Sequence, residues 1–102
     1  MNSSQIEIQA AKAQNVTVTD EALTVDLTDG RTISVPLAWY PRLLYGTPLE
    51  RNHWELIGDG EGIHWPELDE DLSVEGLLLG RPSGESQQSL QRWLENRKKH
   101  HE

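Results

Sequence analysis

The sequence contains no cysteine and no phenylalanine, and its longest run of aliphatic residues is Leu77-Leu78-Leu79. Without cysteine there are no disulfide bonds, thiolate nucleophiles or cysteine-based zinc sites. Without phenylalanine, the four tryptophans must supply much of the large apolar surface of the core. So short an apolar run cannot span a membrane, and the N-terminal residues lack the basic and apolar regions of a secretory signal. We therefore expect a cytoplasmic protein.

The 102 residues include 17 acidic and 9 basic side chains, which gives a formal net charge of -8 with neutral histidines. The basic residues concentrate toward the C-terminus, so residues 1–85 are strongly acidic and residues 86–102 carry a net positive charge. An acidic body repels the phosphates of nucleic acids. We therefore expect a small basic protein as the partner, and neither nucleic acid nor a membrane.

Alternating apolar and polar residues predict three antiparallel strands between residues 15 and 36. A slip of one residue in the pairing would turn the apolar face toward water. Pairing Val18 with Leu23 and Val16 with Val25 keeps all four side chains on one face and leaves a tight turn between the first two strands.

The same argument sets the turn between the second and third strands. A two-residue turn at Asp29-Gly30 would mix the two faces of the sheet. A three-residue loop over residues 28–30 instead pairs Val25 with Ile33, and it requires Gly30 in the left-handed conformation of a G1 bulge. Replacing Gly30 with alanine is therefore expected to be costly.

Two short helices are expected after these strands. Apolar residues recur at helical spacing, but Pro41 fits only the first turn of a helix, so the helix should begin near Tyr40 and end at Gly46. Thr47, which is followed by a proline, then caps a second helix that ends at about Asn52.

A second hairpin is predicted around the glycine-rich segment GDGEG. The register that keeps its faces consistent pairs Leu56 with Ile63. It also places Trp54 opposite Trp65, so both tryptophans lie on the core face.

The acidic segment after this hairpin is expected to form a solvated loop. Its acidic residues are Glu67, Asp69, Glu70 and Asp71. Ser73 can cap a short helix over residues 74–79, and a last helix should begin near Glu85 or Ser86. The apolar stripe of that helix consists of Leu90, Trp93 and Leu94. Three roles fit the stripe: core packing, a homodimer contact, or an anchor for a partner.

Together these elements predict one α+β domain. It has a small antiparallel β-sheet of two or three hairpin-connected strands plus a second hairpin, covered by short helices, with a C-terminal helix. We divide the chain into a flexible arm or edge strand (1–13), the α+β domain (14–82), a C-terminal amphipathic helix (83–99) and a frayed tail (100–102).

Several segments of the chain resemble the DUF2442 family, a small bacterial domain of unknown function. They are VDLTDG at residues 25–30, GIHWP at 62–66, DLS at 71–73 and LL at 77–78. The longer strings DGRTISVPLAWYPRL at 29–43 and LGRPSGES at 79–86 are similar to one compact subgroup of that family. Residues that carry the structural signature are Gly30, Ile63, Trp65, Pro66, Leu72 and Ser73.

The resemblance extends from about Ala11 to Arg97 and implies a small antiparallel sheet covered by short helices. It implies no established activity, and it suggests a place in two-gene arrangements that resemble toxin and antitoxin pairs. Some relatives carry a C-terminal helix-turn-helix. The single terminal helix of this chain departs from that pattern, so direct DNA binding is not expected.

The acidic segment does not meet the requirements of a hard-cation site. Calcium loops need oxygen ligands at alternating positions and a glycine at the turn. Asp69 and Asp71 alternate, but Leu72 and Val74 interrupt the pattern, so we assign no metal ligand.

The two histidines near the second hairpin are predicted to lie on different faces. His64 lies opposite Glu55 on the outer face in the predicted register, whereas His53 lies opposite Pro66. A surface pair of histidine and glutamate is therefore favoured over a zinc site.

No serine stands in a Gly-x-Ser-x-Gly motif, and no glycine-rich segment has a phosphate-binding pattern. We therefore assign no catalytic residue and no cofactor. We expect a non-catalytic protein-interaction module, in the role of the acidic antitoxin-like partner of a bacterial two-gene pair. Its candidate partner-binding residues are Glu67, Asp69, Glu70, Asp71, Trp39, Arg42 and Trp93.

Two alternatives remain open. The first is a small metal-dependent hydrolase that uses the acidic loop through Asp69 and Asp71, together with His64. The second is a nucleic-acid-associated regulator that uses the basic terminal helix.

Overall fold

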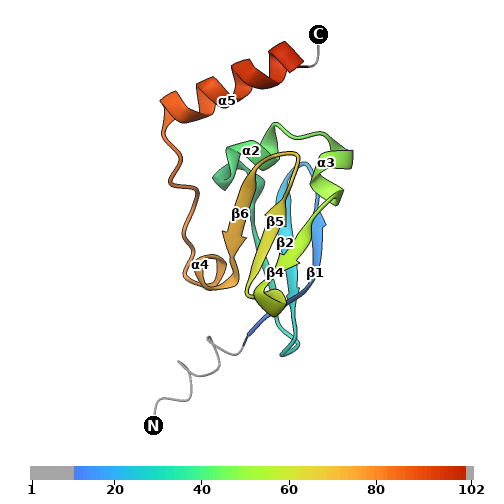
Figure 1. Cartoon of the computed structure of the whole chain (residues 1–102). Helices are drawn as coiled ribbons and strands as arrows, with labels where there is room; N and C mark the ends of the chain where they lie inside the picture. Colours follow the sequence, from blue (N-terminus) through green and yellow to red (C-terminus); the bar gives the residue numbers. More distant parts are fainter. Residues whose placement is uncertain (1–10, 101–102) are drawn as a thin grey trace.

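The computed structural model describes residues 11–100, and two three-stranded antiparallel sheets form its body. The first sheet has the order β1-β2-β3, with β1 at Ala13–Val18, β2 at Ala22–Leu27 and β3 at Thr32–Pro36. The second has the order β4-β5-β6, with β4 at Glu55–Ile57, β5 at Gly62–Trp65 and β6 at Glu70–Ser73. Figure 1 shows the second sheet in front of the first. The chain is therefore an α+β domain, as predicted.

Short helices connect and cover these sheets. They are η1 at Leu37–Trp39, α2 at Pro41–Leu44, α3 at Pro48–Asn52, η2 at Gly58–Gly60 and α4 at Val74–Leu78, followed by the longer α5 at Gln87–His100. The starts of α2 and α3 match the prediction, because each has proline in its first turn. No helix within residues 11–100 is long and apolar enough to cross a membrane.

The arm predicted for residues 1–13 lies mostly outside the described residues, as do residues 101–102 of the predicted tail. Ala11 is buried, and Ala13 is buried and begins β1. The Thr28 N–H donates to the carbonyl of Lys12 at 2.9 Å. Residues 11–13 are thus attached to the first sheet.

The predicted registers of the first sheet and of the β4–β5 hairpin are confirmed, the latter by the pairing of Leu56 with Ile63. In the first sheet, Val18 lies opposite Leu23 and Val25 lies opposite Ile33. The loop at residues 28–30 has the predicted length, because the Leu27 N–H donates to the Arg31 carbonyl at 2.8 Å. Burial of one apolar face was therefore sufficient to fix these pairings.

The acidic segment departs from its prediction, because half of it is strand β6 and not loop. Leu72 lies opposite Ile63, and Asp71 lies opposite His64. The alternation of this strand is short and is hidden by acidic residues on both of its faces. The extended conformation of β6 is favourable only because β5 offers backbone hydrogen-bonding groups along the edge that β4 does not occupy.

The core lies between the two sheets and under the helices. Its largest fully buried side chains are Trp65, Tyr40, Leu23, Leu37, Leu43, Ile63, Leu68, Val25 and Val74. Trp39, Trp54 and Trp93 are partly buried and pack against this cluster. One tryptophan therefore lies at the centre of the core and three lie at its margin.

Arg51 is the one buried charged residue within residues 11–100. Its Nε donates to the Leu43 carbonyl at 2.8 Å, and its Nη2 donates to the Leu44 carbonyl at 2.7 Å. Its Nη1 forms an ion pair with Asp20 at 2.7 Å, in the turn between β1 and β2. In turn, the Arg51 carbonyl accepts a 3.0 Å hydrogen bond from the indole of Trp65. This residue connects the first sheet, α2, α3 and the second sheet.

We expect Gly30→Ala to lower the free energy of unfolding by about 1 kcal/mol. Gly30 has φ of +95°, while an added Cβ would meet no atom within 4 Å, so the cost is conformational. Urea denaturation measures it. Gly84→Ala is the matched control, because Gly84 also has open space but no positive φ. Equal midpoints for the two variants would contradict the left-handed conformation at Gly30.

Candidate functional site

The acidic segment divides into a turn and an edge strand. Glu67 and Asp69 lie in the turn between β5 and β6, and Glu70 and Asp71 begin β6. Successive strand residues point to opposite faces, so Asp71 joins His64 on the outer face while Glu70 points toward the core. The predicted acidic loop therefore supplies two different surfaces.

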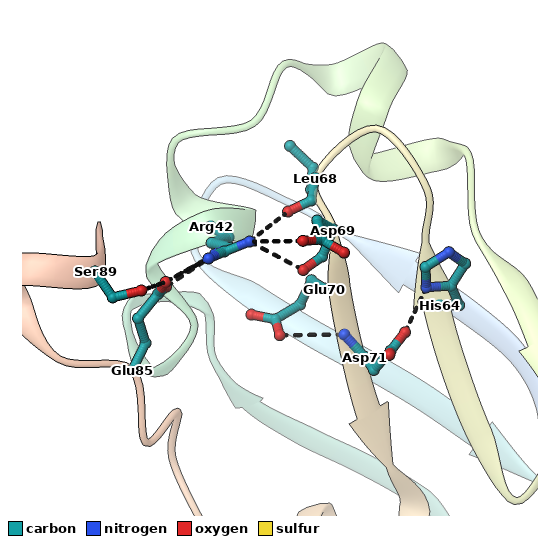
Figure 2. Close-up of polar contacts among 8 residues, drawn as sticks. All are labelled: Arg42, His64, Leu68, Asp69, Glu70, Asp71, Glu85 and Ser89. Carbon is teal, nitrogen blue, oxygen red and sulfur yellow. Dashed lines mark hydrogen bonds and ion pairs between the residues drawn. The ribbon is translucent and has the colours of Figure 1, made fainter. Parts of the chain in front are cut away.

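On the outer face, Asp71 and His64 form a cross-strand pair. His64 Nδ1 is hydrogen-bonded to Asp71 Oδ1, as Figure 2 shows. This hydrogen bond raises the pKa of His64 above its usual 6.5, and the negative charges of Asp71, Glu55 and Asp69 act in the same direction. Glu55 lies opposite His64 in the β4–β5 pair, as predicted, but the side-chain hydrogen bond of His64 is with Asp71, because β6 brings a carboxylate to the other side of β5.

On the core side, Glu70 is half-buried, and burial raises its pKa above the usual 4.5. Its Oε1 accepts a 3.2 Å hydrogen bond from the Asp71 N–H. The carboxylate faces a cleft of about 240 Å³ that lies between β6 and the connector at residues 81–84. Tyr40 also lines this cleft and donates from its hydroxyl to the Arg81 carbonyl at 2.9 Å.

The guanidinium of Arg42 is bonded to other residues of the same chain, as Figure 2 shows. Its Nε donates to Glu85 Oε1 at 2.9 Å, and its Nη2 lies 2.5 Å from Glu85 Oε2. Its Nη1 reaches the Asp69 carbonyl at 3.1 Å and the Asp69 carboxylate at 3.5 Å. The guanidinium therefore ties the acidic turn to the segment before α5.

Trp93 fixes α5 against the rest of the chain. The guanidinium groups of Arg42 and Arg97 lie over its ring, 5.1 Å and 4.8 Å from the ring centre. Arg97 in turn makes a bidentate contact with Glu50 of α3, at 2.8 Å and 3.1 Å. This pair and the cap at Thr47 lower the pKa of Glu50 to about 2. The apolar stripe of α5 is thus half-buried against its own chain.

Trp39 and Glu67 have local partners as well. Trp39 is half-buried, and its carbonyl accepts a 2.9 Å hydrogen bond from the Ser83 N–H. Glu67 Oε1 lies 2.5 Å from His53 Nδ1 at the surface. Among the candidate partner-binding residues, Asp69 and Asp71 have the most exposed carboxylates, at 86% and 69%.

A hollow of about 420 Å³ lies beside Asp71. Ile57 supplies its apolar wall, Leu72 and Ser73 of β6 also line it, and Gly62 leaves it open. Glu61 and Asp71 supply carboxylates at its rim. Ile57 is 44% exposed, which adds apolar surface next to the charges.

The structure brings together only part of each set of candidate residues. Asp71 meets His64, but Asp69 turns toward Arg42, so the three residues of the hydrolase alternative are divided between two environments. No three histidine or acidic side chains within the described part of the chain are placed to hold a metal ion. Sequence reasoning missed Glu85 and Glu50 as partners of the arginines. The spacing of Thr47 and Glu50 was a visible capping-box signal.

The fold and the site define a small α+β domain whose second sheet has an acidic edge strand. The family described as "Protein of unknown function (DUF2442)" matches residues 13–83, more than half of the chain. The protein therefore belongs to the DUF2442 family, which confirms the resemblance. Helix α5 lies beyond the matched residues. No curated protein matches the chain.

Two solved structures are similar to this one. A protein of unknown function from Rhodospirillum rubrum is 28% identical, with a TM-score of 0.63 over 74% of this chain and 93% of that chain. An uncharacterized protein from Chromobacterium violaceum is 20% identical, with a TM-score of 0.65 over 79% of this chain and 76% of that chain. At this identity the second likeness concerns the fold alone.

We expect Asp71→Asn to lower the pKa of His64 toward 6.5, as measured by NMR titration of its ring protons. Because the folded-state pKa is raised, the pair stabilises the fold fully below about pH 6.5 and loses this effect as the pH rises through the folded-state value. Glu21→Gln removes the same charge far from the second sheet and is the control. An unchanged His64 pKa in D71N would contradict the pair.

We expect Glu50→Gln to reduce the pH dependence of the free energy of unfolding below about pH 4.5. The folded-state pKa of Glu50 is about 2 against a usual 4.5, so its contribution is present above about pH 4.5 and is lost as the pH falls toward 2. Urea denaturation between pH 2 and 6 compares wild type with E50Q. Glu75→Gln, in the first turn of α4, is the control. Parallel curves for wild type and E50Q would show that the Arg97 contact adds no stability.

Proposed function

We propose that the chain is a non-catalytic interaction module that binds a small basic protein. In this proposal it acts as the acidic antitoxin-like member of a two-gene pair. The observation that carries the proposal is the surface around β6, where exposed carboxylates border an apolar hollow. We call this surface, formed by Ile57, Glu61, Asp69 and Asp71, the acidic surface.

The chemistry of the acidic surface matches lysine or arginine side chains. Such a side chain has an apolar stem and a charged head. The stem fits against Ile57, while the head reaches Glu61 or Asp71 at the rim of the hollow. One partner side chain can thus satisfy both parts of the surface.

The strength of such binding requires both kinds of contact. An exposed ion pair contributes only about 0.2–1 kcal/mol and is screened by salt. Burial of Ile57, which is 44% exposed, adds an apolar term that salt does not screen. The net charge of -8 adds long-range attraction, which accelerates association with a basic protein.

The aromatic anchors expected from the sequence have a smaller part in this proposal. Trp93 lies under two arginines, and Arg42 is bonded to Glu85 and Asp69. The proposed surface therefore uses the carboxylates of the acidic segment and the aliphatic side chains beside them.

The test is co-expression with the small protein encoded by the neighbouring gene, followed by co-purification and titration calorimetry. We expect a complex whose affinity falls as the salt concentration rises. The double variant Glu61→Gln and Asp71→Asn should raise its Kd by about fivefold or more. The double variant Glu21→Gln and Glu75→Gln removes the same charge elsewhere and should change Kd less than twofold. Absence of a complex, or equal weakening by both double variants, would reject the proposed surface.

A further inference from the structure

Strand β6 has a free edge. It is the outermost strand of the second sheet, and within residues 11–100 no strand pairs with its other side. The Val74 N–H donates to the Glu61 carbonyl at 2.9 Å, on the side of β5. Peptide groups alternate in direction along an antiparallel strand, so those of Leu72 and Glu70 also face β5. The peptide groups of Asp71 and Ser73 therefore face the free edge.

A side chain takes the place of a missing strand at this edge. The Asp71 N–H donates to the carboxylate of Glu70, its own neighbour, at 3.2 Å. An adjacent strand would offer a backbone carbonyl at the same place. Because a side chain can rotate away, that carbonyl can replace it without leaving the N–H unpaired.

Space for another chain lies beside the edge. The cleft of about 240 Å³ is lined by Glu70 to Ser73 on one side and by the connector at residues 81–84 on the other. The backbone of the connector is hydrogen-bonded to other parts of the chain. The Arg81 carbonyl accepts from the Tyr40 hydroxyl, and the Ser83 N–H donates to the Trp39 carbonyl. Its backbone is thus attached to η1 and Tyr40.

We propose that an extended basic segment of the partner adds to the free edge of β6 as a further strand. The segment would bond to the peptide groups of Asp71 and Ser73, with alternate side chains on the outer face and in the cleft. The inference rests on the proposed function and adds the way in which the partner binds.

Charge selects this occupant over a second copy of the chain. Two β6 strands side by side would place Asp71 and Glu70 near their own copies, and like charges across strands are destabilising. A basic segment brings opposite charge instead. In the cleft, one of its cations would meet Glu70, which makes no ion pair within the described residues.

The experiment uses the full chain and a synthetic heptapeptide of alternating lysine and valine. Seven further peptides carry one N-methyl group each, at successive positions. N-methylation removes one N–H, so a paired strand should lose binding at every second residue, by about tenfold, and change little at the residues between. NMR hydrogen exchange should show new protection of the Asp71 and Ser73 amides. A heptapeptide of alternating glutamate and valine is the charge control and should not bind.

Three results would overturn the inference. The first is equal loss at neighbouring N-methyl positions, or no new protection of the Asp71 and Ser73 amides while the peptide binds. This result leaves the proposed function intact, because the acidic surface still binds. The second is no binding of the lysine peptide while the partner protein binds normally. The third is a dimer of the free chain with protected Asp71 and Ser73 amides, which would assign the edge to a second copy. Failure of the proposed function is separate: the partner protein itself does not bind.

Discussion

The buried guanidinium of Arg51 is the contact on which the other parts of the structure depend. Helix α2 has only four residues, so its last carbonyls need partners beyond the helix. Arg51 donates to two of them and pairs with Asp20, while its own carbonyl holds the indole of Trp65. Removing one partner of such a buried charge leaves uncompensated polar groups, so the connection is hard to replace.

Charges in this chain have two different uses. Arg51 is buried and Arg42 and Arg97 are half-buried, and each pairs with a carboxylate and either donates to backbone carbonyls or lies over Trp93. Several acidic side chains remain at the surface, and those of β6 border apolar side chains. Three arginines of this acidic protein therefore hold the fold together, while carboxylates of β6 remain at the surface.

Local sequence patterns predicted the first sheet and the second hairpin with their registers, and they also predicted the helix caps. They succeeded because alternation and turn chemistry act over a few residues. They failed at β6, where acidic residues lie on both faces of the strand and only β5 supplies a reason for extended backbone. The candidate site was therefore predicted by residue identity but not by arrangement. Glu70 and Asp71 are adjacent in sequence, yet one faces the core and the other faces His64.

The sequence by itself determined the α+β class, the family, the registers of the first sheet and of the β4–β5 hairpin, and the acidic character of the protein. These depend on composition and on short-range periodicity, which survive without knowledge of distant contacts. Only the tertiary structure decided which charges are satisfied inside. Glu85 and Arg42 are separated by 43 residues, and Glu50 and Arg97 by 47. Such pairs form only when helices dock. The carboxylates that remain at the surface can therefore be identified only after the carboxylates paired with arginines are known.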